Sequence, residues 1–278
     1  MPLKTESEIL KMRKAGLLVW SSHHLISEII RPGMTTRELD AEVDAFFTAN
    51  HAFPCFKGVP GRRFPYPAAT CISINEQVVH AIPSDRKIEE GDIVSVDTGC
   101  KIDGWCGDAA DTYFAGNVDP ESKKLVDVTR EALMLAIEKL KTAKLWSDVA
   151  GQIERRVKKN GFSVVEVFVG HGIGRQMHEE PQVPNYVYNN FLRYGDFKIR
   201  PGVVIAIEPM VNAGTKRVRE GKDGWEIVTA DGKRSAHIEH SVGILSTGPL
   251  VLTGPPVTAE EKEMVKTFFL RYKGESVI

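Results

Sequence analysis

The sequence predicts a mixed α/β (α+β) fold in which two similar halves, about residues 1–115 and 116–278, share a central sheet with helices on one face. Helical patterns open both halves, and each half then turns to strand-like sequence rich in Val and Ile. A short internal repeat, which places acidic residues at matching positions of the two halves, is the third observation that favours this fold.

The repeat consists of IEEGDIVSVDTG (88–99) and IRPGVVIAIEPM (199–210), which align without gaps. Ile aligns with Ile, Gly with Gly, and Asp97 with Glu208. Chance similarity between two apolar strands is the alternative explanation. Because the acidic positions coincide, we interpret the repeat as a duplicated unit with pseudo-two-fold symmetry in a single domain, residues 1–278.

The first half begins with two helices. Thr5-x-x-Glu8 has the form of a capping box, and the helix is expected to reach about Ile30, where Arg31-Pro32-Gly33 ends it. Thr35-x-x-Glu38 predicts a second, shorter helix ending near Asn50. A strand hairpin follows later in this half, with a turn at Asp103-Gly104 between Val94–Asp97 and Ala109–Phe114.

The second half repeats this order. Asp119-Pro120 predicts an N-cap with proline at the first helical position, and that helix is expected to run to about Lys144. Another helix is expected from about Ser147 to Asn160, closed by Gly161. Apolar strand segments follow each helix pair, as in the first half.

Composition excludes several classes of protein. The formal net charge is -1, so no overall basic field indicates binding to nucleic acid or to an anionic membrane. MPLKTESEIL lacks the apolar core of a secretory signal, and the apolar run around 203–211 is too short to span a bilayer. The four cysteines have neither CxxC spacing nor the density of a disulfide scaffold, which indicates a reducing, cytoplasmic setting: Cys55, Cys71, Cys100 and Cys106.

Four carboxylates and one histidine occupy strand-like segments where burial is expected. They are Asp97, Asp108, His171, Glu208 and Glu239. If they meet, like-charge repulsion in a low dielectric raises their pKa values, and bound divalent cations remove that penalty. Oxygen-rich ligation with one imidazole suits Mn, Fe(II) or Co better than a thiolate zinc site does. The predicted chemistry is metal-assisted hydrolysis.

Other hydrolase motifs do not fit. The segment His178-Glu179-Glu180-Pro181 begins like HExxH but lacks the second histidine, and the proline breaks the helix that this motif requires. GxSxG and GxxxxGK[ST] do not occur in the chain. A nucleophile pair formed by Cys71 and His80 is an alternative hypothesis, although nothing in the sequence favours it.

The ordered acidic set and its surroundings resemble a known family. The segments are CISINEQVVHAIP, VDTG, GDAADT, GHGIGRQMHEEPQV, EPM and IEHSV. They resemble the pita-bread metallopeptidases (family M24) and are similar to type I methionine aminopeptidases in particular, from about Lys4 to Thr253. The resemblance implies the pita-bread fold, with a curved, mostly antiparallel sheet and helices on its outer face. It also implies removal of the initiator methionine before a small second residue, by attack of a metal-bound hydroxide on the first peptide bond.

The resemblance further implies the role of each site residue. Two divalent ions (Co, Mn, Fe(II), Zn or Ni) would be held by Asp97, Asp108, His171, Glu208 and Glu239, with Asp108 and Glu239 bridging. Glu208 would also move a proton. His80 would contact the scissile amide, and His178 the substrate carbonyl. The methionine side chain would lie among Tyr66, Cys71, Met177 and Trp225. Met177 departs from the family, where an aromatic residue is common, and the segment 184–197 is longer and more aromatic than usual.

Partners also follow from the resemblance. We expect a monomer that acts on nascent polypeptide N-termini, without membrane or sequence-specific nucleic-acid binding. Brief ribosome contact would use the basic loop that contains Lys216, Arg217, Arg219 and Lys222. A loop that is merely exposed to solvent explains these basic residues equally well. The two rival hypotheses are an X-Pro peptidase of the same fold, which usually has an extra N-terminal domain, and a non-catalytic binding module, which usually loses the ligands.

Overall fold

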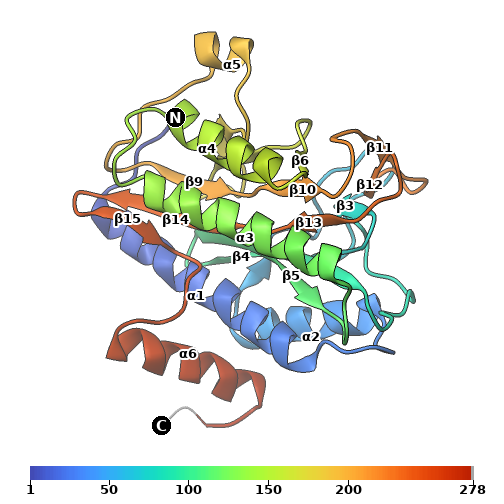
Figure 1. The fold of residues 1–278 in the computed structure, drawn as a ribbon. Coiled ribbons are helices and arrows are strands. Elements are labelled where there is room, and N and C mark those ends of the chain that lie inside the picture. Colours follow the sequence, from blue (N-terminus) through green and yellow to red (C-terminus); the bar gives the residue numbers. More distant parts are fainter. Residues whose placement is uncertain (277–278) are drawn as a thin grey trace.

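Helix pairs alternate with antiparallel strands in the structure, a computed structural model that describes residues 1–276 (Figure 1). The helices are α1 (Glu6–Ile29), α2 (Thr36–Ala49), α3 (Pro120–Lys139), α4 (Trp146–Lys159), α5 (Asn189–Tyr194) and α6 (Ala259–Tyr272). Figure 1 shows α3 and α4 crossing in front of the strands, with α1 and α2 below them. Within residues 1–276, no helix is both long and apolar enough to cross a membrane.

The first half contributes a four-stranded sheet built on a long hairpin. Its strands are β1 (Phe53–Pro54), β2 (Thr70–Ile74), β4 (Ile93–Ile102) and β5 (Trp105–Phe114). β4 and β5 pair along ten residues, and the turn between them has positive φ at both Asp103 and Gly104, as the hairpin signal predicts. Gly107 of β5 packs against α1, since a Cβ there would lie 2.8 Å from the Ala15 carbonyl carbon. Its neighbour Asp108 points to the opposite face.

The second half contributes a five-stranded antiparallel sheet in the order β15-β14-β9-β7-β8. The remaining strands form two three-stranded sheets, β13-β10-β6 and β11-β12-β3, and the second of these includes β3 from the first half. The bounds are β3 (Gln77–Val79), β6 (Ser163–Val164), β7 (Gly170–Gly172), β8 (Glu179–Val183), β9 (Val204–Ile207), β10 (Met210–Asn212), β11 (Val218–Glu220), β12 (Ile227–Thr229), β13 (Ser235–His237), β14 (His240–Leu245) and β15 (Gly248–Val251).

Hydrogen bonds join the two halves along β5. The Glu239 N–H donates to the carbonyl of Ala110 at 2.8 Å, and the Ser241 hydroxyl donates to the carbonyl of Asp108 at 2.7 Å. Each half runs helix, helix, antiparallel strand pair, and each strand pair has two acidic residues on it or at its ends. This order agrees with the predicted duplication.

Two cores support the layers. One packs α1, α2 and α6 on the first sheet, with Phe46, Phe47 and Phe268 almost completely buried. The other packs α3 and α4 on the second sheet around Trp146, which is fully buried. All four cysteines are free thiols.

The helix boundaries agree with the sequence except at one end. Both predicted capping boxes are present, at Thr5 and Thr35. α3, expected to reach about Lys144, ends at Lys139 because the following segment pairs elsewhere: the Ile199 N–H donates to the Lys144 carbonyl, 3.0 Å away. The sequence analysis also missed α5 and α6, although α6 begins with a capping box at Thr258.

Candidate metal centre

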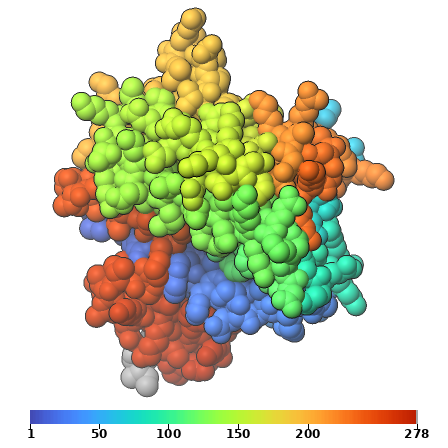
Figure 2. Space-filling view, viewed as in Figure 1, coloured from blue at the N-terminus to red at the C-terminus, as the bar shows by residue number. Residues whose placement is uncertain are grey.

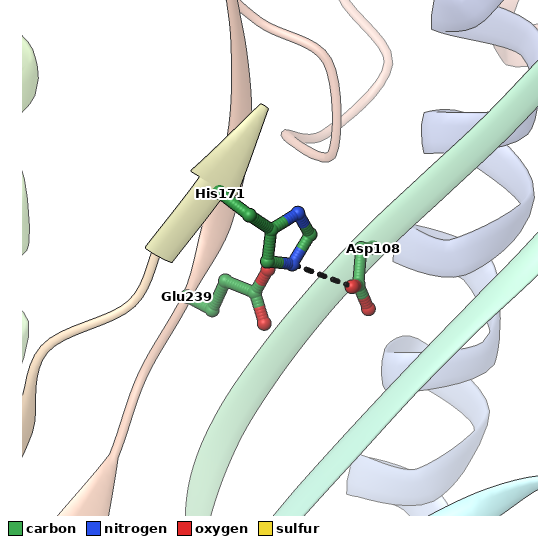
Figure 3. A group of neighbouring side chains, drawn as sticks. All are labelled: Asp108, His171 and Glu239. Carbon is green, nitrogen blue, oxygen red and sulfur yellow. Dashed lines mark ion pairs between the residues drawn. The ribbon is translucent and has the colours of Figure 1, made fainter. Parts of the chain in front are cut away.

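The predicted acidic residues converge on one point between the two halves. Figure 3 shows Asp108, His171 and Glu239 facing one another from β5, β7 and the junction before β14. One ligand atom from each of these three lies within 4.8 Å of the others. Glu208 belongs to the same cluster, because its Oε1 lies 3.6 Å from His171 Nε2, and Asp97 of β4 lines the same cavity.

Glycines make room for this cluster. Gly99 is paired with Asp108, and a Cβ at Gly99 would lie 2.9 Å from Asp108 Oδ1. Gly170 and Gly172 flank His171, and a Cβ on either would lie 2.3 Å from a backbone oxygen, of Ala206 or Glu180 respectively. Such distances exclude a side chain, so the Gly-His-Gly sequence is a packing requirement of this strand.

The cluster is buried and short of hydrogen-bond donors. Asp97 Oδ1, Asp108 Oδ1 and Glu239 Oε1 have no hydrogen-bond partner among the described residues. Burial, and then the neighbouring carboxylates, raise the pKa values of Asp97 and Glu239 well above their ordinary range. Burial also raises the pKa of Glu208, to about 8. Buried carboxylates are rarely left without a donor, so these residues fit a divalent cation.

His171 is oriented for the same role. Its Nδ1 lies 2.9 Å from the carbonyl of Gly172 and therefore donates to it, so Nε2 is the ring nitrogen that faces the carboxylates. Burial lowers the pKa of this histidine, but the contact with Asp108 and the charge of Glu208 outweigh burial and raise it to about 9 without a metal ion. A cation bound at Nε2 would replace the proton on that nitrogen.

Comparison with known proteins places the chain in a family. The model "Metallopeptidase family M24" matches residues 10–245. The chain belongs to metallopeptidase family M24. It is 47% identical over 252 residues to the methionine aminopeptidase of Clostridium perfringens, covering 90% of this chain and 98% of that one. It is 42% identical over 250 residues to methionine aminopeptidase 1 of Bacillus subtilis, with the same coverage.

Solved structures of family members confirm the pita-bread fold. The methionine aminopeptidase of Rickettsia prowazekii superposes with a TM-score of 0.85 at 34% identity, over 91% of this chain and all of that one. The Thermotoga maritima enzyme gives 0.84 at 44% identity, over 91% and 99%. The prolidase of Pyrococcus furiosus gives 0.70 at 23% identity, over 92% of this chain and 66% of that one, which shows a shared fold.

A mostly apolar cavity adjoins the acidic cluster of this M24 protein. The four residues that the resemblance assigned to the methionine pocket all line this cavity: Tyr66, Cys71, Met177 and Trp225. Phe56 and Val59, which the sequence did not single out, also line it. Tyr66 is fixed in place, with its hydroxyl 3.0 Å from the carbonyls of Thr70 and Ala81 and its ring edge-on to Trp225.

His80 and His178 line the cavity beside the cluster. His80 follows β3 with a positive φ of 62° and contacts Phe168 edge-on. Burial, and then the charge of His178, lower the pKa of His80 to about 4. Burial and the charge of His171 also lower the pKa of His178, whose ring centre lies 4.4 Å from that of His171. Both rings are therefore neutral near pH 7.

Two other aspartates of the hairpin lie away from the cluster. Asp103 is in the turn and pairs with Lys14 at 2.6 Å. Asp111 of β5 pairs with Arg130 of α3 at 2.9 Å. The segment 184–197 carries α5, which projects from the second half (Figures 1 and 2), and Tyr194 there is 81% exposed.

One histidine of the site was not identified from the sequence. His237 of β13 is 2% exposed, and its Nε2 lies 3.7 Å from Glu208 Oε2 with no hydrogen-bond partner among the described residues. Burial lowers its pKa to about 3, so the ring is neutral. The alternation in SAHIEHSV predicts a buried position for His237, but the sequence alone does not connect it to Glu208.

Proposed function

We propose that this chain is a methionine aminopeptidase that removes the N-terminal methionine from polypeptides with a small second residue. The observation that carries the proposal is the buried, donor-poor acidic cluster beside a mostly apolar cavity. The C. perfringens and B. subtilis relatives, with the names given above, support the substrate class.

The residues proposed to hold the metal are the five of the cluster, Asp97, Asp108, His171, Glu208 and Glu239. Four carboxylates would balance the charge of two divalent ions, and the two halves of the chain both contribute to them, Asp108 from the first half and Glu239 from the second. Co, Mn, Fe(II), Zn and Ni all suit these donors. Bound cations would supply Lewis acidity and lower the pKa of water, as hydrolysis of an amide at neutral pH requires.

The chain's own side chains bind and orient the substrate. His178, neutral and next to His171, is proposed to donate a hydrogen bond to the scissile carbonyl, where charge develops. His80 is proposed to contact the scissile amide nitrogen. Glu208 has a pKa near neutrality without metal and is proposed to move the proton between water and the leaving amine.

The apolar cavity is proposed to bind the methionine side chain. Tyr66 and Trp225 supply aromatic walls, while Cys71 and Met177 supply polarisable sulfur atoms that suit a thioether. Because Met177 is unbranched and flexible, its effect is on the shape of the pocket. The reaction type is set by the acidic cluster.

The proposed catalytic unit is a single domain of residues 1–278, since the cluster takes ligands from both halves. We propose that it is monomeric and works in the cytoplasm on nascent chains. Brief ribosome contact through the loop of Lys216, Arg217, Arg219 and Lys222 is proposed from the family resemblance. Charge reversal of this loop should abolish co-sedimentation with ribosomes at low salt, and unchanged sedimentation would contradict the contact.

Peptide turnover tests the proposed activity. With Mn(II) or Co(II), the protein should release methionine from Met-Ala-Ser and leave Met-Lys-Ser uncut. Asp108→Asn is the matched inactive control, because it keeps the side-chain shape. Absence of Met-Ala-Ser turnover with every divalent metal would refute the proposal, and preference for Ala-Pro over Met-Ala substrates would point to an X-Pro peptidase.

A further inference from the structure

The carboxylate of Glu208 lies between two imidazole rings. His171 Nε2 is 3.6 Å from Glu208 Oε1, and His237 Nε2 is 3.7 Å from Glu208 Oε2. The two histidines differ in what their rings can donate. The Nδ1 proton of His171 points to the carbonyl of Gly172, so Nε2 is the nitrogen that would bind a cation, and a cation-bound Nε2 cannot donate to Glu208.

His237 has no such competing demand on its Nε2. That nitrogen is buried and without a partner among residues 1–276, and a buried unpaired nitrogen costs free energy. A movement of less than about 1 Å would bring the Nε2–Oε2 distance into hydrogen-bond range. The neutral ring then donates from Nε2, and His237 also lines a second cavity that shares Asp97, His171 and Glu208 with the site.

The backbone of His237 is held by the hairpin that carries Asp97 and Asp108. The hydroxyl of Thr112 on β5 donates to the His237 carbonyl at 2.8 Å and accepts from the His237 N–H at 3.2 Å. Because Thr112 has a single hydroxyl hydrogen, Ser95 of β4 donates to Thr112 in their 2.8 Å contact. All three residues are at most 3% exposed.

The strand register brings this ring to Glu208. His237 is paired with Met210 across β13 and β10, and Glu208 lies two residues before Met210. Diagonal neighbours of this kind are within reach of long side chains. The backbone of Glu208 is fixed separately, since the Asn185 amide donates to its carbonyl at 3.0 Å.

We propose that His237 is a positioning residue, which fixes the Glu208 carboxylate by donating a hydrogen bond from Nε2 to Oε2. The fixed carboxylate presents its other oxygen, Oε1, toward His171 and the proposed cation site. This inference rests on the proposed metal centre and adds to it a residue from outside the ligand set. It also gives the buried Ser95–Thr112 hydroxyl pair a function, which is to couple the first half to the position of Glu208.

Two substitutions at this position separate hydrogen bonding from packing. His237→Leu removes the donor, whereas His237→Gln keeps a neutral donor of similar reach. His240→Gln is the matched control, because His240 is three residues away and its Nδ1 contacts the hydroxyl of Thr253 at 2.9 Å, with no contact to Glu208. Urea unfolding of each metal-free variant reports whether it folds.

Mn(II) affinity by titration calorimetry is the primary measurement, followed by kcat and KM for Met-Ala-Ser. His237→Leu should lower Mn(II) affinity and kcat by about 10–100-fold, the usual effect of losing a residue that orients a metal ligand. KM should change less than about threefold, because the apolar cavity for methionine does not include His237. His237→Gln should recover most of both losses, and His240→Gln should lose neither.

Three results would overturn the proposal: native affinity and kcat in His237→Leu, equal losses in His237→Leu and His237→Gln, or an equal loss in His240→Gln. Failure of the proposed function looks different. If the unchanged chain binds Mn(II) but releases no methionine, the activity is wrong, while the order of Mn(II) affinities among the variants still decides the role of His237.

Discussion

Glu208→Gln should make the metal-free protein more stable, although it replaces a residue of the proposed active site. The Glu208 side chain is 13% exposed and lies among other carboxylates. Burial raises its pKa to about 8, so the carboxyl group must take up a proton when the metal-free chain folds at pH 7. Glutamine has the same shape and requires no such proton.

The magnitude follows from the pKa difference. The folded-state pKa lies above the unfolded value of 4.5, so the folded state binds more protons between these values and stability decreases as pH rises through that window. At pH 7, about 2.5 pH units above the unfolded pKa, the loss of folding free energy is about 1.4 kcal/mol for each pH unit, or roughly 3 kcal/mol in all. At pH 7 the Glu208 carboxyl group is mostly protonated, so its replacement removes little of the negative charge that favours protonated His171, and we expect a net gain of about 1–3 kcal/mol.

Urea unfolding in EDTA at pH 7 and pH 5 measures this gain, with Glu28→Gln on the exposed surface of α1 as control. The gain should fall below about 1 kcal/mol at pH 5, because pH 5 lies only about half a pH unit above the unfolded pKa of 4.5 and few protons remain to be taken up on folding. Adding Mn(II) should stabilise the unchanged protein and stabilise the variant less. A metal-free variant that is less stable at pH 7, or a metal-induced gain equal to that of the unchanged protein, would refute the reasoning.

Three further predictions concern other parts of the molecule. Burial lowers the pKa of His240 to about 4, below the unfolded value of 6.5, so the unchanged protein should lose stability as pH falls through this window. His240→Gln should reduce this dependence of the unfolding free energy on pH by up to about 1.4 kcal/mol per pH unit, measured by urea unfolding at several pH values. Arg13→Met should cost about 3–5 kcal/mol, measured by urea unfolding, because the buried guanidinium is paired with Glu261 and bonds the carbonyls after β15. Met177→Ala should raise KM for Met-Ala-Ser about tenfold in steady-state kinetics, with kcat nearly unchanged, because it enlarges the apolar cavity.

Local signals predicted the parts of the fold that depend on local interactions. The capping boxes at Thr5 and Thr35 and the Asp103-Gly104 turn are satisfied within a few residues of chain, so sequence suffices to find them. The end of α3 is different, because pairing with residues 197–199, more than fifty positions away, determines where the helix stops.

The same distinction applies to the site. The five acidic and imidazole residues of the cluster were found because their residue types contradict their apolar surroundings and because the surrounding segments resemble a family. Phe56 and Val59 carry no such signal, since an apolar residue in a loop is ordinary in sequence and lines a cavity only through the fold. His237 was missed because its contact with Glu208 depends on the register of β13 against β10.

Anomalous diffraction from crystals of the protein soaked in Mn(II) tests the central claim most directly. The account predicts two manganese peaks inside the cluster of Asp97, Asp108, His171, Glu208 and Glu239, with Asp108 and Glu239 contacting both and His237 Nε2 within about 3.2 Å of Glu208 Oε2. Manganese peaks elsewhere, with no peak at the five-residue cluster at saturating Mn(II), would contradict the account.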